Sequence, residues 1–248
     1  MQVKNMKNIC LIILLCCFCI SAQAKIKIGT PKYAPPYSIN DPKQGVSGFD
    51  IDYMKKACQR LSWDCEFIPM KYIELTDALK ENKIDLAIGA MVITQNQQNS
   101  IIFSLPYLTS DAGFLVSKNS SIDNVSALQG KKVGALHGKA YIDYLSERFN
   151  QQISIVPYEV FTSIAMDLNE GKIDAIFMNY LSALYLKQQF SDRVRVLSEH
   201  FQVGDGIGIA AMPANKDKID QINKAILQFQ TDGTFTNLYN YYFQFIIN

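Results

Sequence analysis

The sequence predicts an α/β protein with two similar lobes joined by two chain crossings, and three observations carry this prediction. Apolar strands alternate with amphipathic helices along most of the chain, which indicates parallel sheets covered by helices on both faces. The phrases LKENKIDLAI, from Leu79, and LNEGKIDAIF, from Leu168, repeat one helix-to-strand junction at a period too long for a solenoid. The C-terminal tail carries too few elements for a third lobe, so we expect it to complete the first.

Each element follows from its local pattern of apolar and polar residues. The first lobe is expected to contain strands at 25–30, 65–70 and 85–93, helices at 49–61 and 73–81, and a proline-stiffened loop at 33–39. The second lobe is expected to contain strands at 113–117, 131–136, 153–158 and 174–178, and helices at 126–130, 140–149 and 161–171. A glycine-containing strand at 200–215 and helices at 217–233 and 234–246 form the tail.

These elements divide the chain between the two lobes. We expect residues 25–112 plus 206–248 in the first lobe and residues 113–205 in the second. The chain would then cross between the lobes near 109–116 and again near 200–208. Two lobes with a cleft between them form a ligand clamp that closes by hinge motion.

The first 24 residues indicate export. Lys4 and Lys7 precede the apolar run ICLIILLCCFCI, and SAQA supplies small residues for cleavage after Ala24. The apolar run is too short to span a bilayer. We therefore interpret residues 1–24 as a cleaved signal peptide and expect a periplasmic protein.

The mature chain retains two cysteines and almost no net charge. Cys58 and Cys65 predict a disulfide in an oxidising compartment, and two buried free thiols are the alternative. Nearby ligands are too few for zinc, so no metal is expected. Without the two lysines of the signal, 22 basic and 23 acidic residues leave a net charge near −1. Neither nucleic acid nor an anionic membrane surface is indicated as a partner.

An ordered set of short stretches extends over nearly the whole mature chain: KIKIGT with APPY, GFDID before the Cys58/Cys65 pair, ALKENKIDLAI, VIT, FSLPY, ALQGKKVGALHG, NEGKIDAIF, GDGIGIA and DGTFTNLYNYYF. In this set the chain resembles the periplasmic polar amino-acid-binding proteins of ABC importers, solute-binding protein family 3, and is similar to lysine/arginine/ornithine- and histidine-binding members. The resemblance implies a type II periplasmic binding protein fold, a monomer without a cofactor, a membrane ABC permease as partner, and a disulfide between the two cysteines.

The family's charged clamp is missing at the matching positions. Members that bind α-amino acids hold the ligand carboxylate with an Arg, which matches Gln97 here, and receive the α-ammonium on an Asp, which matches Asn179. A further Asp aligns with Pro31. The polar strand-end positions and the Gly-Ser-Thr turn of the family fall on Gly89, Ala90, Val92, Gly138, Lys139 and Ala140. Because losing one partner of a buried charge pair costs about 2–5 kcal/mol, a free amino acid is not assured as the ligand.

Aromatic residues supply the other half of the expected site. Tyr37 and Tyr72 match positions where relatives place rings against the ligand, and Tyr33 is an alternative if the loop shifts by one residue. The competing interpretation is that these rings cover the edge of the first sheet. Met91 suits either a pocket floor or a core. With Val92, these residues predict a pocket less polar than that of its relatives.

Lys139 is the new charge at this site. It precedes a predicted helix, where an anion is favoured, so we hypothesise that Lys139 and Gln97 receive an acidic or neutral polar group of the ligand. The alternative is a solvated lysine. His137 is interpreted as a packing residue, and His200 as a residue of the hinge side or surface.

The function predicted from these features is capture of a small polar ligand, such as an amino acid or a related compound, and its delivery to an ABC importer. A sensing clamp that signals through a partner is one alternative. A dehydratase-like enzyme on the same fold is another, although Asp205 is the one acid that we place near the cleft. Nucleotide-binding, zinc-protease and serine-hydrolase motifs are absent, so we expect no enzyme.

Overall fold

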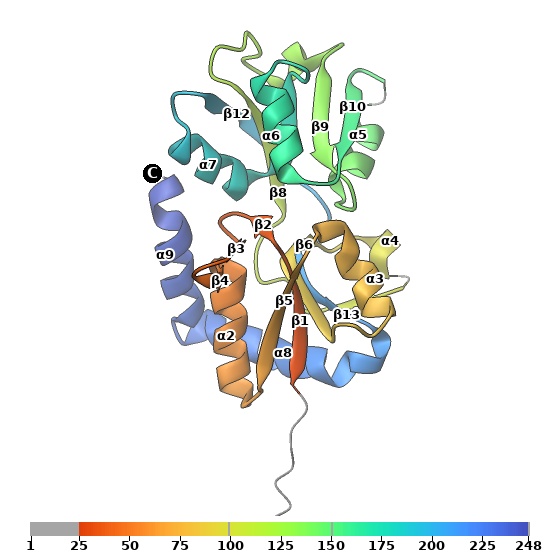
Figure 1. Cartoon of the computed structure of the whole chain (residues 1–248), viewed down its shortest axis with the longest axis vertical. Coiled ribbons are helices and arrows are strands. Elements are labelled where there is room, and N and C mark those ends of the chain that lie inside the picture. The colour runs from red at the N-terminus through yellow and green to blue at the C-terminus, as the bar shows by residue number, and fades with distance from the viewer. Residues whose placement is uncertain (1–24, 99, 150, 248) are drawn as a thin grey trace, which may run out of the picture.

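The computed structural model describes residues 25–98, 100–149 and 151–247, and the expected signal peptide at 1–24 lies outside them. Within this part of the chain the strands form two five-stranded sheets and one three-stranded sheet. Figure 1 shows the two larger sheets one above the other, each with its own helices. The fold is the α/β fold with two lobes that the sequence predicts.

The first lobe is built on a sheet with the strand order β5-β1-β6-β13-β7. Its strands are β1 (Ile26–Pro31), β5 (Cys65–Met70), β6 (Leu86–Val92), β7 (Ile102–Phe103) and β13 (Ile207–Ala211). Its helices are α2 (Phe49–Leu61), α3 (Leu75–Lys80), α4 (Gln95–Gln98), α8 (Lys216–Thr231) and α9 (Thr234–Ile247). Neighbouring residues of β6 enter two different cores, so both faces of this sheet are covered.

The second lobe is built on a sheet with the strand order β10-β9-β11-β8-β12. Its strands are β8 (Asp111–Ser117), β9 (Lys132–Leu136), β10 (Ser154–Tyr158), β11 (Ala175–Asn179) and β12 (Val194–Gln202). Its helices are α5 (Tyr141–Phe149), α6 (Phe161–Asn169) and α7 (Tyr180–Gln189). Here too, Phe114 and Leu115 enter cores on opposite faces.

The proline-stiffened segment forms a small antiparallel sheet instead of a simple loop. Its strands are β2 (Tyr33–Ala34), β3 (Ser38–Asp41) and β4 (Gly45–Ser47). Three 3-10 helices complete the described elements, at Tyr72–Glu74, Val125–Leu128 and Pro213–Asn215. The small sheet lies at the side of the first lobe that faces the second (Figure 1).

The expectation of purely parallel sheets is wrong. β13 runs antiparallel to β6, and β8 runs antiparallel to β11. The parallel strands of each lobe end at the cleft, whereas β8 and β13 begin there because the chain enters them from the other lobe. A strand that begins at the edge of the sheet where its neighbours end must run antiparallel to them. The sequence prediction also missed α7 and treated 200–215 as one strand, although β12 and β13 belong to different sheets.

The two crossings lie side by side. Asp111 at the start of β8 pairs with Gln202 at the end of β12, and Leu108 forms an isolated bridge with Ile207 on the first-lobe side. Between these pairs, the main-chain N–H of Val203 donates to the carbonyl of Ser110 at 3.2 Å. The crossings are therefore hydrogen-bonded to one another from one lobe to the next.

Two glycines permit the second crossing. Gly204 and Gly206 have φ angles of +69° and +112°, a region that L side chains rarely adopt. A Cβ atom on Gly204 would collide with the carbonyl oxygen of Ile93, and one on Gly206 would lie 2.6 Å from the Cβ of Pro106. These contacts show that the two glycines permit close backbone packing at this crossing.

The repeated helix-to-strand junction has the same physical role in both lobes. The main-chain N–H of Lys27 donates to Oδ2 of Asp85 at 2.9 Å, and the N–H of Asp85 donates back to the carbonyl of Lys27 at 2.8 Å. Lys132 and Asp174 make the same two bonds, both at 2.8 Å. Through these two bonds, Asp85 links the start of β6 to the parallel strand β1, and Asp174 links the start of β11 to the parallel strand β9.

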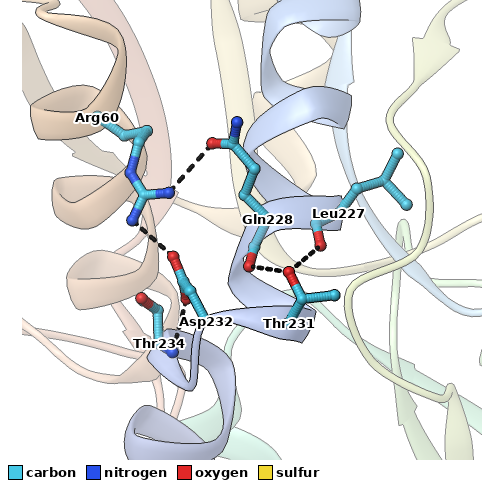
Figure 2. Close-up of polar contacts among 6 residues, drawn as sticks. All are labelled: Arg60, Leu227, Gln228, Thr231, Asp232 and Thr234. Atoms are coloured by element: carbon cyan, nitrogen blue, oxygen red, sulfur yellow. Dashed lines mark hydrogen bonds and ion pairs between the residues drawn. The ribbon is translucent and has the colours of Figure 1, made fainter.

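Figure 2 shows how the end of α2 is tied to the turn between α8 and α9. Arg60 donates to Oε1 of Gln228 at 3.1 Å and to Oδ2 of Asp232 at 2.7 Å. The other oxygen of Asp232 accepts the main-chain N–H of Thr234 at 2.9 Å. The bonds from Thr234 and the Arg60 guanidinium lower the pKa of Asp232 to about 2. This link attaches the C-terminal helices to α2.

Cys58 and Cys65 form the expected disulfide, with an S–S distance of 2.04 Å. The bond joins the last turn of α2 to the first residue of β5. The alternative of two free thiols is therefore wrong.

Replacing both cysteines with alanine should lower the free energy of unfolding by about 2–3 kcal/mol, because the disulfide closes a short loop in the unfolded chain. Urea unfolding of the double variant and of the oxidised wild type measures the difference. Equal unfolding free energies would contradict this expectation. The wild type measured with a reductant serves as the control, and it should approach the variant.

Candidate functional site

The two lobes meet around a small cavity of about 40 Å³. Tyr37 and Ala90 line it from the first lobe, and Lys139, Tyr141 and Asn179 line it from the second. Beside the cavity, Tyr37 and Lys139 make hydrogen bonds to the opposite lobe.

The first-lobe wall is organised by the buried carboxyl of Asp50, in the first turn of α2. Its Oδ2 accepts the main-chain N–H of Ala90 at 2.8 Å, and its Oδ1 accepts the hydroxyl of Tyr107 at 2.8 Å. Ala90 has a φ angle of +49°, which is uncommon for a residue with a side chain. The bond from Asp50 thus helps to hold the end of β6 in a strained conformation.

Burial raises the pKa of Asp50 from 3.8 to about 7, against the opposing effects of Tyr107, Ala90 and Lys139. The sequence prediction missed this residue, because an acid in the first turn of a helix is also what the helix dipole favours. Its position between Phe49 and Ile51, two fully buried apolar side chains, is the signal that could have identified it.

Lys139 crosses the cleft from the second lobe. Its Nζ donates to the carbonyls of Ala90 at 3.3 Å and Gly89 at 3.5 Å, and it lies 3.8 Å from the ring centroid of Tyr72. The residue as a whole is partly exposed, yet its ammonium lies deep enough that burial lowers the pKa of Lys139 to about 7. The attraction of Asp50 acts in the other direction.

A second contact across the cleft joins Tyr37 to Asn179. The hydroxyl of Tyr37 donates to Oδ1 of Asn179 at 2.9 Å, and both residues are buried. The same oxygen accepts the main-chain N–H of Ser182 at 3.1 Å, so Asn179 is the N-cap of α7. Exposed Lys71 of the first lobe and Glu159 of the second form an ion pair at 3.3 Å, at the rim of the cleft. Because both side chains are exposed, dissolved salt weakens their attraction.

The other expected site residues are placed as follows. Met91 and Val92 are buried in the hydrophobic cores, and neither lines the cavity. Gly89 packs against the Pro31 ring, which a Cβ would strike. Gln97 lies in α4, and its side chain is outside the described residues.

The remaining candidates lie around the second lobe. Ala140 packs against the second-lobe core, and Gly138 has a φ angle of +82° in the turn before α5. His137 is exposed, so its interpretation as a packing residue is wrong. Exposed His200 stacks on the Tyr180 ring at 4.5 Å between centroids. Asp205 is exposed beside the crossings and does not line the cavity.

The chemistry available at the cavity is therefore one ammonium, several phenol hydroxyls, an amide and apolar surface. None of its lining residues carries a carboxyl group. In the described part of the chain, no group of three or more His, Cys, Asp or Glu residues could hold a metal. Helices long and apolar enough to cross a bilayer are absent from the same residues.

The chain belongs to the bacterial extracellular solute-binding proteins, family 3, whose family model matches residues 26–245. It is 34% identical over 230 residues to the histidine-binding periplasmic protein of Salmonella typhimurium, a match that covers 89% of this chain and 88% of that protein. These findings confirm the family expected from the sequence.

Solved structures agree with this assignment. An arginine 3rd transport system periplasmic binding protein from Legionella pneumophila aligns with a TM-score of 0.83 and 32% identity, covering 88% of this chain and 99% of that one. An ancestral amino-acid-binding protein, a precursor of cyclohexadienyl dehydratase, aligns with a TM-score of 0.80 and 25% identity, covering 90% and 97%. The predicted two-lobe binding-protein fold is confirmed.

Replacing Asp50 with asparagine should remove a pH-dependent contribution to stability. The folded pKa of about 7 exceeds the ordinary 3.8, so the folded state binds the proton more tightly. The stabilisation from this group is present below pH about 4 and is lost as the pH rises to about 7. The unfolding free energy of the wild type, relative to Asp50→Asn, should therefore fall across this window. A flat difference in urea titrations would contradict this, and exposed Asp77→Asn is the control.

Replacing Tyr37 with phenylalanine should open the clamp, because it removes the hydroxyl that donates to Asn179 and keeps the ring. One hydrogen bond contributes about 0.5–1.5 kcal/mol, so the ratio of closed to open molecules should fall about two- to twelvefold. Small-angle X-ray scattering should report a larger radius of gyration. Tyr53→Phe is the matched control, because its buried hydroxyl has no hydrogen-bond partner in the described structure. An identical scattering profile for both variants would overturn the expectation.

Proposed function

We propose that this protein is an exported binding protein that captures a small polar ligand, an amino acid or a related compound, between its lobes and delivers it to a membrane ABC permease. The observation that carries the proposal is the cavity at the meeting of the two lobes, lined from both sides and closed by Tyr37 and Lys139. A site shared by two lobes that are linked by two adjacent crossings couples ligand capture to closure. We propose lobe boundaries close to the expected 112/113 and 205/206, with the first at 110/111 because β8 begins at Asp111 in the second sheet.

Several observations support periplasmic delivery. The relative from Salmonella typhimurium is named a histidine-binding periplasmic protein. The Cys58–Cys65 disulfide suits an oxidising compartment. A signal peptide at 1–24 would bring the chain there, and we propose that the mature protein acts as a monomer whose closed form is presented to the permease.

We assign the ligand contacts to the residues that meet at the cavity. Tyr37 and Asn179 close one side, and Lys139 with Tyr72 closes the other. Gly89 and Ala90 contribute carbonyl oxygens at the end of β6. Gln97 remains a proposed contact from α4.

We propose binding without catalysis. A dehydratase requires a group that donates a proton to the leaving hydroxyl. Asp50 has its two carboxyl oxygens engaged by Ala90 and Tyr107, and it does not line the cavity. A sensing clamp would use the same closure with a different partner.

The test is thermal unfolding of the ligand-stripped protein against the twenty amino acids, ornithine, small dicarboxylates, aromatic acids and short amines. A ligand at 100 times its dissociation constant should stabilise the folded protein by about 2.7 kcal/mol and raise the unfolding midpoint. Tyr72→Leu should weaken that ligand about two- to thirtyfold, because the ring holds Lys139 by a cation–π contact. Exposed Tyr241→Leu is the control. No shift with any compound would count against delivery and favour the sensing role.

A further inference from the structure

One polar group at the cavity has no partner. Tyr141 is 2% exposed and lines the cavity, and its hydroxyl makes no hydrogen bond in the described structure. Buried polar groups without partners are rare, and each costs free energy unless something binds it. Burial raises the pKa of Tyr141, with a further contribution from Tyr72, so this phenol stays neutral and able to donate.

Lys139 places a second donor at the same cavity. An ammonium has three N–H groups, and the carbonyls of Gly89 and Ala90 are two acceptors of the Lys139 ammonium. Its Nζ lies 5.8 Å from the ring centroid of Tyr141. The ammonium of Lys139 and the hydroxyl of Tyr141 are thus two donors at one cavity, and a carboxylate has two oxygens that can accept from them.

The acceptors that would hold a ligand ammonium are already engaged. The carbonyls of Gly89 and Ala90 and the ring face of Tyr72 receive the Lys139 ammonium. Oδ1 of Asn179 accepts from both Tyr37 and Ser182. A second cation would have to displace a tethered lysine and would be repelled by it.

Apart from Ser182 and Tyr33, the rest of the cavity wall is apolar. Leu136, Phe161, Ile176, Phe177, Met178 and Leu186 contribute to it from the second lobe. Asp50 does not line the cavity, and its two carboxyl oxygens accept from Ala90 and Tyr107.

Resting on the proposed binding function, we propose that the ligand of this cleft is a small carboxylic acid with an apolar body and no ammonium group. Lys139 and Tyr141 receive its carboxylate, and the apolar wall of the second lobe receives its body. Lys139 occupies the cation position that a ligand ammonium would otherwise take.

The test uses compounds that share a carbon skeleton. One set is leucine, isocaproate and isoamylamine, and the other is phenylalanine, hydrocinnamate and phenethylamine. Isothermal titration near neutral pH should give tighter binding for a carboxylate than for the amino acid of the same set, and no binding for the amine. Lys139→Met should weaken the carboxylate at least about tenfold, and Tyr141→Phe about tenfold.

The controls keep the outcomes distinct. Tyr53→Phe removes the other buried hydroxyl without a partner and should leave the affinity unchanged, because Tyr53 does not line the cavity. Circular dichroism checks that each variant is folded. If Lys139→Met does not fold, Tyr141→Phe, which loses one oxygen atom, still tests the carboxylate contact.

Binding of an amino acid or an amine without its matched carboxylate would overturn this inference and leave the proposed binding function intact. An unchanged carboxylate affinity in folded Lys139→Met and Tyr141→Phe would overturn the assigned contacts. Failure of all six compounds, together with the wider panel above, would overturn both this inference and the proposed function.

Discussion

The buried carboxyl of Asp50 is the interaction on which the cleft depends. It joins the first turn of α2, the end of β6 and the segment that carries Tyr107 toward the first crossing. Because it holds the main-chain N–H of Ala90, it also sets the direction of the Gly89 carbonyl in the same planar peptide unit, which receives Lys139 from the other lobe. Burying this group disfavours its charged form, and two hydrogen bonds offset part of that cost.

The polarity of the cleft follows from this arrangement. A carbonyl-rich strand end and an aromatic face form a place suited to a cation. In this chain the cation belongs to the protein, because Lys139 reaches across from the turn before α5. The charge of Lys139 disfavours a second cation in the remaining space. The apolar wall of the second lobe favours an apolar group there. The two-lobe frame of the family is thus combined with a lysine of the protein itself at the cleft.

Much of the fold could be predicted from the sequence because its signals are local. The helix at 49–61 and the strand at 65–70 have the expected bounds, and the junctions at Asp85 and Asp174 are equivalent. The directions of β8 and β13 could not be predicted, since they depend on which edge the chain enters after a crossing. Periodicity within a strand contains no information about its direction.

Several residues of the candidate site could be placed near the cleft from the sequence, but their contacts could not be predicted. Lys139, Tyr37, Tyr72 and Asn179 were expected near the cleft and do line it or face one another across it. Asp50 was missed, because its role depends on Ala90 forty positions away. Lys139 meets acceptors 49 and 50 positions away in the sequence. Such pairings arise from tertiary structure alone.

The paired crossings have a mechanical consequence. Two separate linkers would let the lobes bend, twist and slide independently. Here the strands that enter and leave the second lobe are bonded to one another, and the bridge between Leu108 and Ile207 continues this pairing on the other side. The ribbon can bend about one axis but resists shear along the strands. Closure therefore has few degrees of freedom, and each cycle returns the same atoms to opposite walls of the cleft.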